Sequence, residues 1–220
     1  MKYSKIIGIS IIIIITISLN SYADDLTLQG RTALGFRISN VDYSGDSYSV
    51  YGYDVDVEID NAVMFGVNYT GFVTDFFSIE ASADYVKTDT DLSSGGLSGK
   101  AGELTQIPIF LSFRLSPPNK FRVVPFIGGG VGFFINDFDQ NDETIEYIYG
   151  SGAKVEVENS LGYFVSGGLE IFITNHVALN FDAKYIWNDI DVGVSTPGFN
   201  VETLESNMVV IGGGLKYFFE

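Results

Sequence analysis

Residues 177–189 alternate strictly between two sets of side chains, and this two-residue period restricts the fold more than any other feature of the sequence. One set consists of Val177, Leu179, Phe181, Ala183, Tyr185 and Trp187, and the other consists of Ala178, Asn180, Asp182, Lys184, Ile186 and Asn188. Successive side chains of a β-strand point to opposite faces of its sheet. The stretch is therefore predicted to be a strand with one apolar and one mostly polar face.

Seven further stretches show the same period, so the chain is predicted to be all-β with eight strands. The predicted strands are 26–38, 60–73, 76–87, 103–115, 121–136, 160–173, 177–189 and 204–219. Short turns alternate with long loops, and the long loops are 39–58, 88–102, 137–158 and 189–203. All short turns then lie at one end of an eight-stranded antiparallel up-and-down β-barrel. Outer-membrane barrels have this asymmetry, with short periplasmic turns and longer extracellular loops.

Residues 1–23 have the pattern of a secretory signal peptide. Lys2 and Lys5 precede an apolar run at 6–19, and Ser21 and Ala23 are the small residues expected before a cleavage site. The run is shorter than the roughly 20 residues of a membrane-spanning helix. We therefore expect a mature chain of one barrel domain, residues 24–220. It has no cysteine, so disulfides cannot hold it together.

The mature chain is strongly acidic. The whole sequence has a formal charge of −16, and removal of Lys2 and Lys5 brings it to −18. This charge argues against nucleic acid as a partner, because such binding depends on Lys and Arg that neutralise phosphates. Two predicted loop regions, 42–60 and 137–158, hold much of the excess acid.

The charged side chains of the predicted strands share one face, opposite an apolar face. A soluble barrel such as a lipocalin would turn that charged face to water, and the period alone leaves both arrangements open. The charges on this face nearly balance, which favours a narrow lumen where opposite signs pair. An Arg or Lys that faces lipid at mid-bilayer would cost about 2–4 kcal/mol. The predicted ion lattice of the lumen consists of Arg31, Arg37, Glu80, Asp84, Arg114, Glu170, Asp182, Lys184 and Lys216.

Several stretches resemble the OmpW family of outer-membrane barrels. They are RVVPFIGGGVGFFIND at 122–137, GLEIFITNHVALN at 168–180, WNDIDV at 187–192, TDFFSIE at 74–80 and the aromatic last strand. The order of these stretches over the mature chain carries the resemblance more than any single motif. One departure is Glu220, which follows the aromatic Phe219 where the family usually ends.

Inward positions near the long loops are apolar. They are Met64, Val86, Leu104, Phe134, Phe164, Ile186, Met208 and Val210. These side chains could simply fill the interior, since an eight-stranded barrel is only just wide enough for side chains. They could instead line an apolar pocket above a polar plug, and the resemblance implies this second interpretation because OmpW proteins are implicated in uptake of small hydrophobic molecules.

Enzymatic activity is not expected. Most barrel enzymes need a histidine as general base, and the single histidine, His176, lies at a predicted short turn, far from the long-loop rim. The carboxylates of the lumen have cationic neighbours and are more simply explained as ion pairs. No cofactor and no metal site is predicted.

Two functions from different classes follow from these observations. The first is a monomeric outer-membrane barrel that offers a path to small hydrophobic solutes, with the lipid bilayer, lipopolysaccharide and the outer-membrane insertion machinery as partners. The alternative is a structural or surface-interaction barrel that uses its acidic, tyrosine-rich loops at 43–60 and 137–158.

Overall fold

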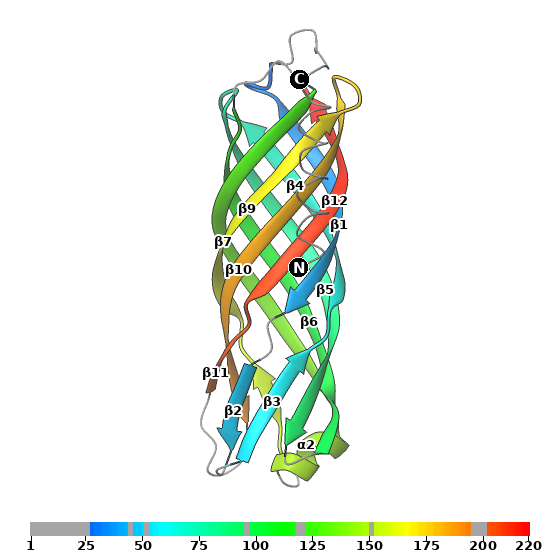
Figure 1. Cartoon of the computed structure of the whole chain (residues 1–220), viewed down its shortest axis with the longest axis vertical. Coiled ribbons are helices and arrows are strands. Elements are labelled where there is room, and N and C mark those ends of the chain that lie inside the picture. The colour runs from blue at the N-terminus through cyan, green and yellow to red at the C-terminus, as the bar shows by residue number, and fades with distance from the viewer. Residues whose placement is uncertain are drawn as a thin grey trace, which may run out of the picture.

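The computed structural model describes residues 27–43, 46–50, 53–94, 97–117, 122–149, 152–194 and 202–220. The predicted signal peptide lies outside these described residues. Figure 1 shows the elements, which are β1 Thr32–Tyr43, β2 Asp46–Val50, β3 Tyr53–Ile59, β4 Ala62–Phe72, β5 Phe77–Ser94, β6 Leu97–Leu115, β7 Val123–Gln140, α2 Asp142–Tyr149, β8 Val155–Val157, β9 Ser160–Phe172, β10 Val177–Val194, β11 Glu202–Glu205 and β12 Met208–Phe219.

Eight of these strands close into a barrel. Each is antiparallel to its neighbours, in the order β1, β4, β5, β6, β7, β9, β10 and β12, and β12 pairs back onto β1. Closure runs the full length of β1, from Thr32 opposite Phe219 to Tyr43 opposite Met208. The structure confirms the predicted eight-stranded antiparallel barrel.

The outer wall of the barrel is an apolar belt. Large apolar side chains that point outward are about half exposed, among them Phe36, Val67, Ile109 and Leu215. Trp187 packs between Tyr163 and Tyr185 on this wall, with ring centroids 5.1 and 4.7 Å away. In the described part of the chain, no helix is long and apolar enough to cross a membrane.

Several strands continue well past this belt toward the long loops, which the sequence analysis did not predict. β5, β6, β7 and β10 have 18 or 19 residues each, and much of 88–102, 137–140 and 189–194 is strand where loops were expected. Beyond the belt an outward side chain need not be apolar, so the alternation of hydrophobicity fades although the backbone pairing goes on.

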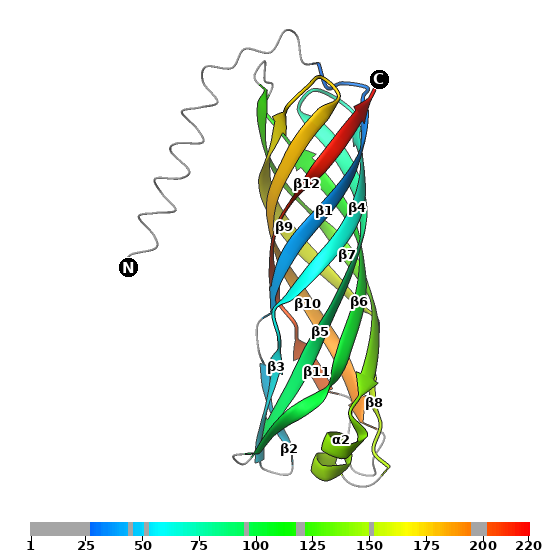
Figure 2. The ribbon, with the colours of Figure 1, turned by 90° about the vertical axis from the view of Figure 1, so that its right-hand side faces the viewer.

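Smaller elements complete this extension. β2 and β3 form a hairpin that pairs with β5, while β8 and β11 pair with opposite edges of β10. Figure 2 shows them with α2 at the end of the barrel away from the C-terminus. The two predicted interaction loops thus contain the β2–β3 hairpin, α2 and β8.

The first strand begins six residues later than predicted, at Thr32 instead of residue 26. Residues 27–31 instead turn across the short-turn end of the barrel, where Gly30 has φ +79°. The backbone N–H groups of Leu28 and Gln29 donate to one carboxylate oxygen of Asp75, at 3.0 and 2.9 Å. This anchor buries Leu28 in the barrel end.

Replacing Asp75 with Ala should loosen this segment without opening the barrel. Both N–H groups lose a charged acceptor, so we expect amide hydrogen exchange at Leu28 and Gln29 to become about tenfold faster. Asp75→Asn keeps an oxygen acceptor and is the matched control. Equal exchange in all three proteins would show that the carboxylate does not hold the segment.

Candidate functional site

The inward side chains of β10 pass through the layers of the lumen in order. Starting from the short-turn end, they are Ala178, Asn180, Asp182, Lys184, Ile186, Asn188 and Ile190, and all are buried. An apolar position is followed by polar and charged ones, then by an apolar one and an amide. Neighbouring strands show a similar order of side-chain types, so the lumen consists of stacked layers that are apolar, charged, apolar and polar in turn.

The lowest layer, at the short-turn end, is an apolar plug that the sequence analysis missed. Phe218 lies near its centre, with the rings of Phe172 and Phe72 at 4.7 and 5.7 Å. We call it the lower apolar layer, and it consists of Leu28, Ala33, Phe72, Val124, Phe172, Ala178 and Phe218. Alternating Phe, Val and Ala positions in the strand ends could have indicated it.

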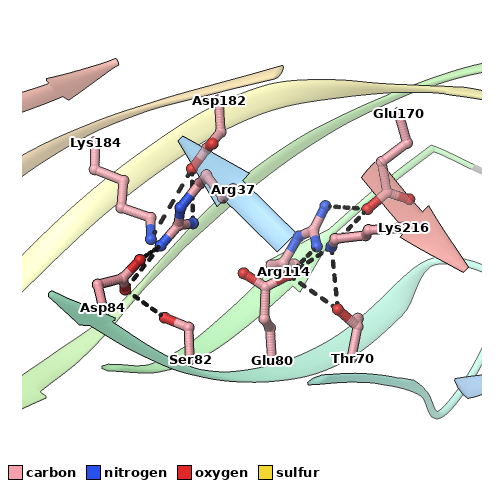
Figure 3. A network of polar contacts seen from close by, with 10 residues as sticks. All are labelled: Arg37, Thr70, Glu80, Ser82, Asp84, Arg114, Glu170, Asp182, Lys184 and Lys216. Carbon is pink, nitrogen blue, oxygen red and sulfur yellow. Dashed lines mark hydrogen bonds and ion pairs between the residues drawn. The ribbon is translucent and has the colours of Figure 1, made fainter. Parts of the chain in front are cut away.

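The ion lattice lies directly above this layer, and its lower half joins four strands (Figure 3). Arg114 donates to Glu80 at 2.6 Å and to Glu170 at 2.7 Å. Lys216 bridges the same two carboxylates at 2.6 and 3.0 Å and also donates to Thr70. These four charged side chains form a closed ring of ion pairs, each at most 7% exposed.

The upper half of the lattice is less regular. The Arg37 guanidinium binds both oxygens of Asp84, at 2.7 and 2.9 Å, and reaches Asp182 at 3.3 Å. Ser82 donates to Asp84. The Lys184 ammonium lies 3.9 Å from Asp182 and makes no hydrogen bond within the described chain. Each half therefore holds two cations and two anions, so buried charges of opposite sign balance.

The structure places Arg31 outside this lattice, contrary to the sequence prediction. Arg31 precedes β1 and donates to the backbone oxygen of Asn175 in a short turn, with its guanidinium over the ring of Phe218. The alternation of a longer first strand predicted an inward position, but the chain has already turned across the barrel end here. The other eight predicted lattice residues lie together.

The upper apolar layer covers the lattice on the long-loop side. Phe110 lies at its centre, edge-on to the rings of Phe134 and Phe164 at 5.6 and 5.3 Å. The layer consists of Val41, Tyr43, Ala62, Met64, Val86, Phe110, Phe134, Phe164, Ile186, Met208 and Val210. Seven of the eight residues predicted for the pocket belong to it, and the eighth, Leu104, is buried further toward the loops.

Phe110 belongs to this layer but was not among the predicted pocket residues, although the alternation of its strand places it inward. Above the layer, amides and hydroxyls form a polar rim. The Tyr43 hydroxyl donates to Gln106 at 2.7 Å, and Gln106 donates to Asn136 at 2.9 Å. Ser160 donates to Asn188 across the lumen wall. The upper apolar layer is thus bounded by polar groups on both sides.

The barrel wall beside the upper apolar layer has an interruption. Between β5 and β6 the antiparallel ladder runs to Ala83 opposite Ile109 and resumes at Val86 opposite Gln106. The two positions skipped on β6 are Ile107 and Pro108. Proline has no N–H to donate and is rarely tolerated inside a sheet. The register is the same on both sides of this interruption, so at the height where the lattice meets the upper apolar layer the wall lacks the hydrogen bond that Pro108 cannot donate.

A hollow of about 400 Å³ lies elsewhere, at the short-turn end between β6 and β7. It is lined by Phe76, Leu115, Ser116, Pro117, Pro125, Phe126 and Ile127. None of the predicted pocket residues contributes to it. Leu115 and Ile127 are exposed on the apolar belt, so this hollow belongs to the outer wall and not to the lumen.

A closed eight-stranded barrel with an apolar belt and a charged interior defines the class of outer-membrane β-barrels. Solved structures share the fold. OprG of Pseudomonas aeruginosa matches with a TM-score of 0.75 at 19% identity, over 90% of this chain and 100% of that one. Outer membrane protein W of E. coli matches with a TM-score of 0.56 at 14% identity, over 87% and 98%.

The chain belongs to the OmpW family, whose family model matches residues 30–216. A curated relative, the 22 kDa outer membrane protein of Rhizobium leguminosarum bv. viciae, is 24% identical over 146 residues, which are 64% of this chain. The chain spans 58% of that relative's length. These matches confirm the predicted family and the location in the bacterial outer membrane, embedded in the lipid bilayer. The short-turn end is then the periplasmic end.

Proposed function

We propose that this barrel takes up small hydrophobic molecules from the outside, holds them in the upper apolar layer and releases them sideways into the membrane. The position of that layer carries the proposal. It lies above the ion lattice and the lower apolar layer, and beside the interrupted ladder between β5 and β6. The association of the OmpW family with small hydrophobic molecules is consistent with this function.

Passage straight through to the periplasm is opposed by both lower layers. An apolar solute would have to break the ion pairs of Arg114 and Lys216 with Glu80 and Glu170, all of them buried. Below these pairs it would meet the packed rings around Phe218. Separation of buried charges by an apolar group is strongly unfavourable.

Sideways release meets less resistance. The two positions of β5 without a partner in the ladder are Asp84, which belongs to the lattice, and Tyr85, which precedes Val86 of the upper apolar layer. Pro108 itself points inward and is buried. A solute beside Val86 and Phe110 is therefore separated from lipid by a part of the wall that has one backbone hydrogen bond fewer, because Pro108 cannot donate.

Phe134→Asp should reduce uptake of a labelled apolar solute into vesicles that contain the protein, by about tenfold or more. The side chain is fully buried in the upper apolar layer, where a carboxylate would be surrounded by apolar side chains. Phe134→Leu keeps the site apolar and should retain most uptake. If Phe134→Asp folds and transports as well as the original protein, the upper apolar layer is not on the path.

A further inference from the structure

Lys184 is the one cation of the ion lattice, among the described residues, whose charged group makes no hydrogen bond at all. Its side chain is 3% exposed, so water does not replace the missing partners at the surface. The ammonium lies 4.8 Å from the ring centroid of Phe110 and 5.5 Å from that of Phe164. It therefore sits at the boundary between the lattice and the upper apolar layer, with three donors unused.

Other unsatisfied polar atoms gather around the same place. Asp182 and Ser39 flank Gly212 from the two strands beside it, and Asp182 Oδ1 and Ser39 Oγ both lack a partner in the described chain. Arg37 Nε is unsatisfied as well. Ser39 leans over the glycine, since a Cβ at Gly212 would come within 2.1 Å of its hydroxyl. Buried polar atoms nearly always have partners, so these atoms offer donors and acceptors to a polar molecule in the lumen.

We propose that Lys184 and Asp182 form the head-group subsite of the upper apolar layer and that its preferred ligand is a medium-chain amphiphile with a hydroxyl head. The Lys184 ammonium donates to the hydroxyl oxygen, and the hydroxyl hydrogen is donated to Asp182 Oδ1. The hydrocarbon tail lies beside Phe110 and Phe164. This assignment rests on the proposed function and names the class of molecule that the path favours.

Charge balance selects the hydroxyl over other head groups. Arg37 and Lys184 already balance Asp84 and Asp182, as Figure 3 shows for these four side chains. A carboxylate head would add an uncompensated buried charge, and an ammonium head would do the same with opposite sign. A plain alkane would leave Lys184 Nζ and Asp182 Oδ1 without hydrogen-bond partners. A hydroxyl accepts one hydrogen bond and donates another, so it can satisfy both.

The test compares four tritiated probes of similar length, 1-decanol, decane, decanoate and decyl methyl ether. Binding is measured by equilibrium dialysis against the full-length protein in micelles, with empty micelles subtracted. We expect decanol to bind about tenfold more tightly than decane, a ratio typical of two hydrogen bonds to buried groups. The ether accepts but cannot donate, so it should fall between them, and decanoate should show no advantage over decane.

Lys184→Met should abolish the preference for decanol and leave decane binding unchanged, whereas Lys184→Arg should keep part of it. The matched control is Lys87→Met, because Lys87 lies outside the lumen, paired with Glu103. The ligand series on the original protein tests the subsite even if Lys184→Met does not fold. No preference for decanol in the original protein, or an unchanged preference in Lys184→Met, would overturn the subsite. If decane does not bind to the original protein at all, this result would instead contradict the proposed function itself.

Discussion

Arg114→Met should lower the free energy of unfolding by about 3–5 kcal/mol, the usual effect of removing one partner from a buried ion pair. Arg114 is 3% exposed and is the partner of both Glu80 and Glu170. Without it, Lys216 alone faces two buried carboxylates. The guanidinium also lies 3.6 Å from the centroid of the Phe126 ring, and this stacking is lost too.

Urea unfolding of the protein in lipid vesicles measures this change through the fluorescence of the single tryptophan, Trp187. Arg122→Met is the matched control. Arg122 donates to the backbone oxygen of Ile173 at an exposed turn, so its loss should change the unfolding free energy by less than about 1 kcal/mol. Similar effects of the two substitutions would show that the lattice does not stabilise the barrel.

A disulfide across the interrupted ladder should stop sideways release. Ala83 and Ile109 are the last paired positions before the interruption, and both point outward. The chain has no cysteine of its own, so Ala83→Cys with Ile109→Cys introduces a single defined bridge. Oxidation should reduce uptake of an apolar solute at least about tenfold, since opposite Cβ atoms of an antiparallel pair are close enough for a bond that holds the strands together.

Reduction of the bridge should restore uptake in the same sample. Ala183→Cys with Ile211→Cys is the control, because these paired residues have the same original side chains and lie between β10 and β12, on the far side of the barrel. Its oxidation should leave uptake unchanged. If the bridge at 83 and 109 forms fully and uptake continues, solutes do not leave between β5 and β6.

Alternation within the apolar belt was enough to predict the barrel. A side chain there meets either lipid or the lumen, so the period of two is visible, as at 177–189. Beyond the belt the outward side chains can be polar as well, as Lys87 and Asp89 are, and the pairing of β5 and β6 past Thr88 left no such signal. The turn at 27–31 was not predicted for a different reason. Leu28 and Arg31 fit the alternating pattern of the first strand, although the strand begins only at Thr32.

The residues that make up the site could be predicted from the sequence, but most of the contacts between them could not. The charges of the lattice were identified because a lone charge on an inward face needs a partner. Their division into a closed ring around Arg114 and an incomplete group around Lys184 depends on whether a charged pair lies at 2.7 Å, as Arg114 and Glu170 do, or at 3.9 Å, as Lys184 and Asp182 do. The stagger between strands sets these distances. The interruption at Pro108 depends likewise on which neighbour its missing N–H would have faced.

The hydrogen-bonded ring ends where β1 and β12 end, at Tyr43 and Met208. Past that point β2 pairs only with β3, and β8 and β11 pair only with β10, among the described strands, so the extension has open edges. The ring below loses a strand only when the ladders on both sides of that strand break, whereas the extension can lose an edge strand by breaking one ladder. We therefore expect two cooperative units in one chain. Amide hydrogens of the closed barrel should exchange slowly, and those of the extension should exchange faster and independently of the barrel.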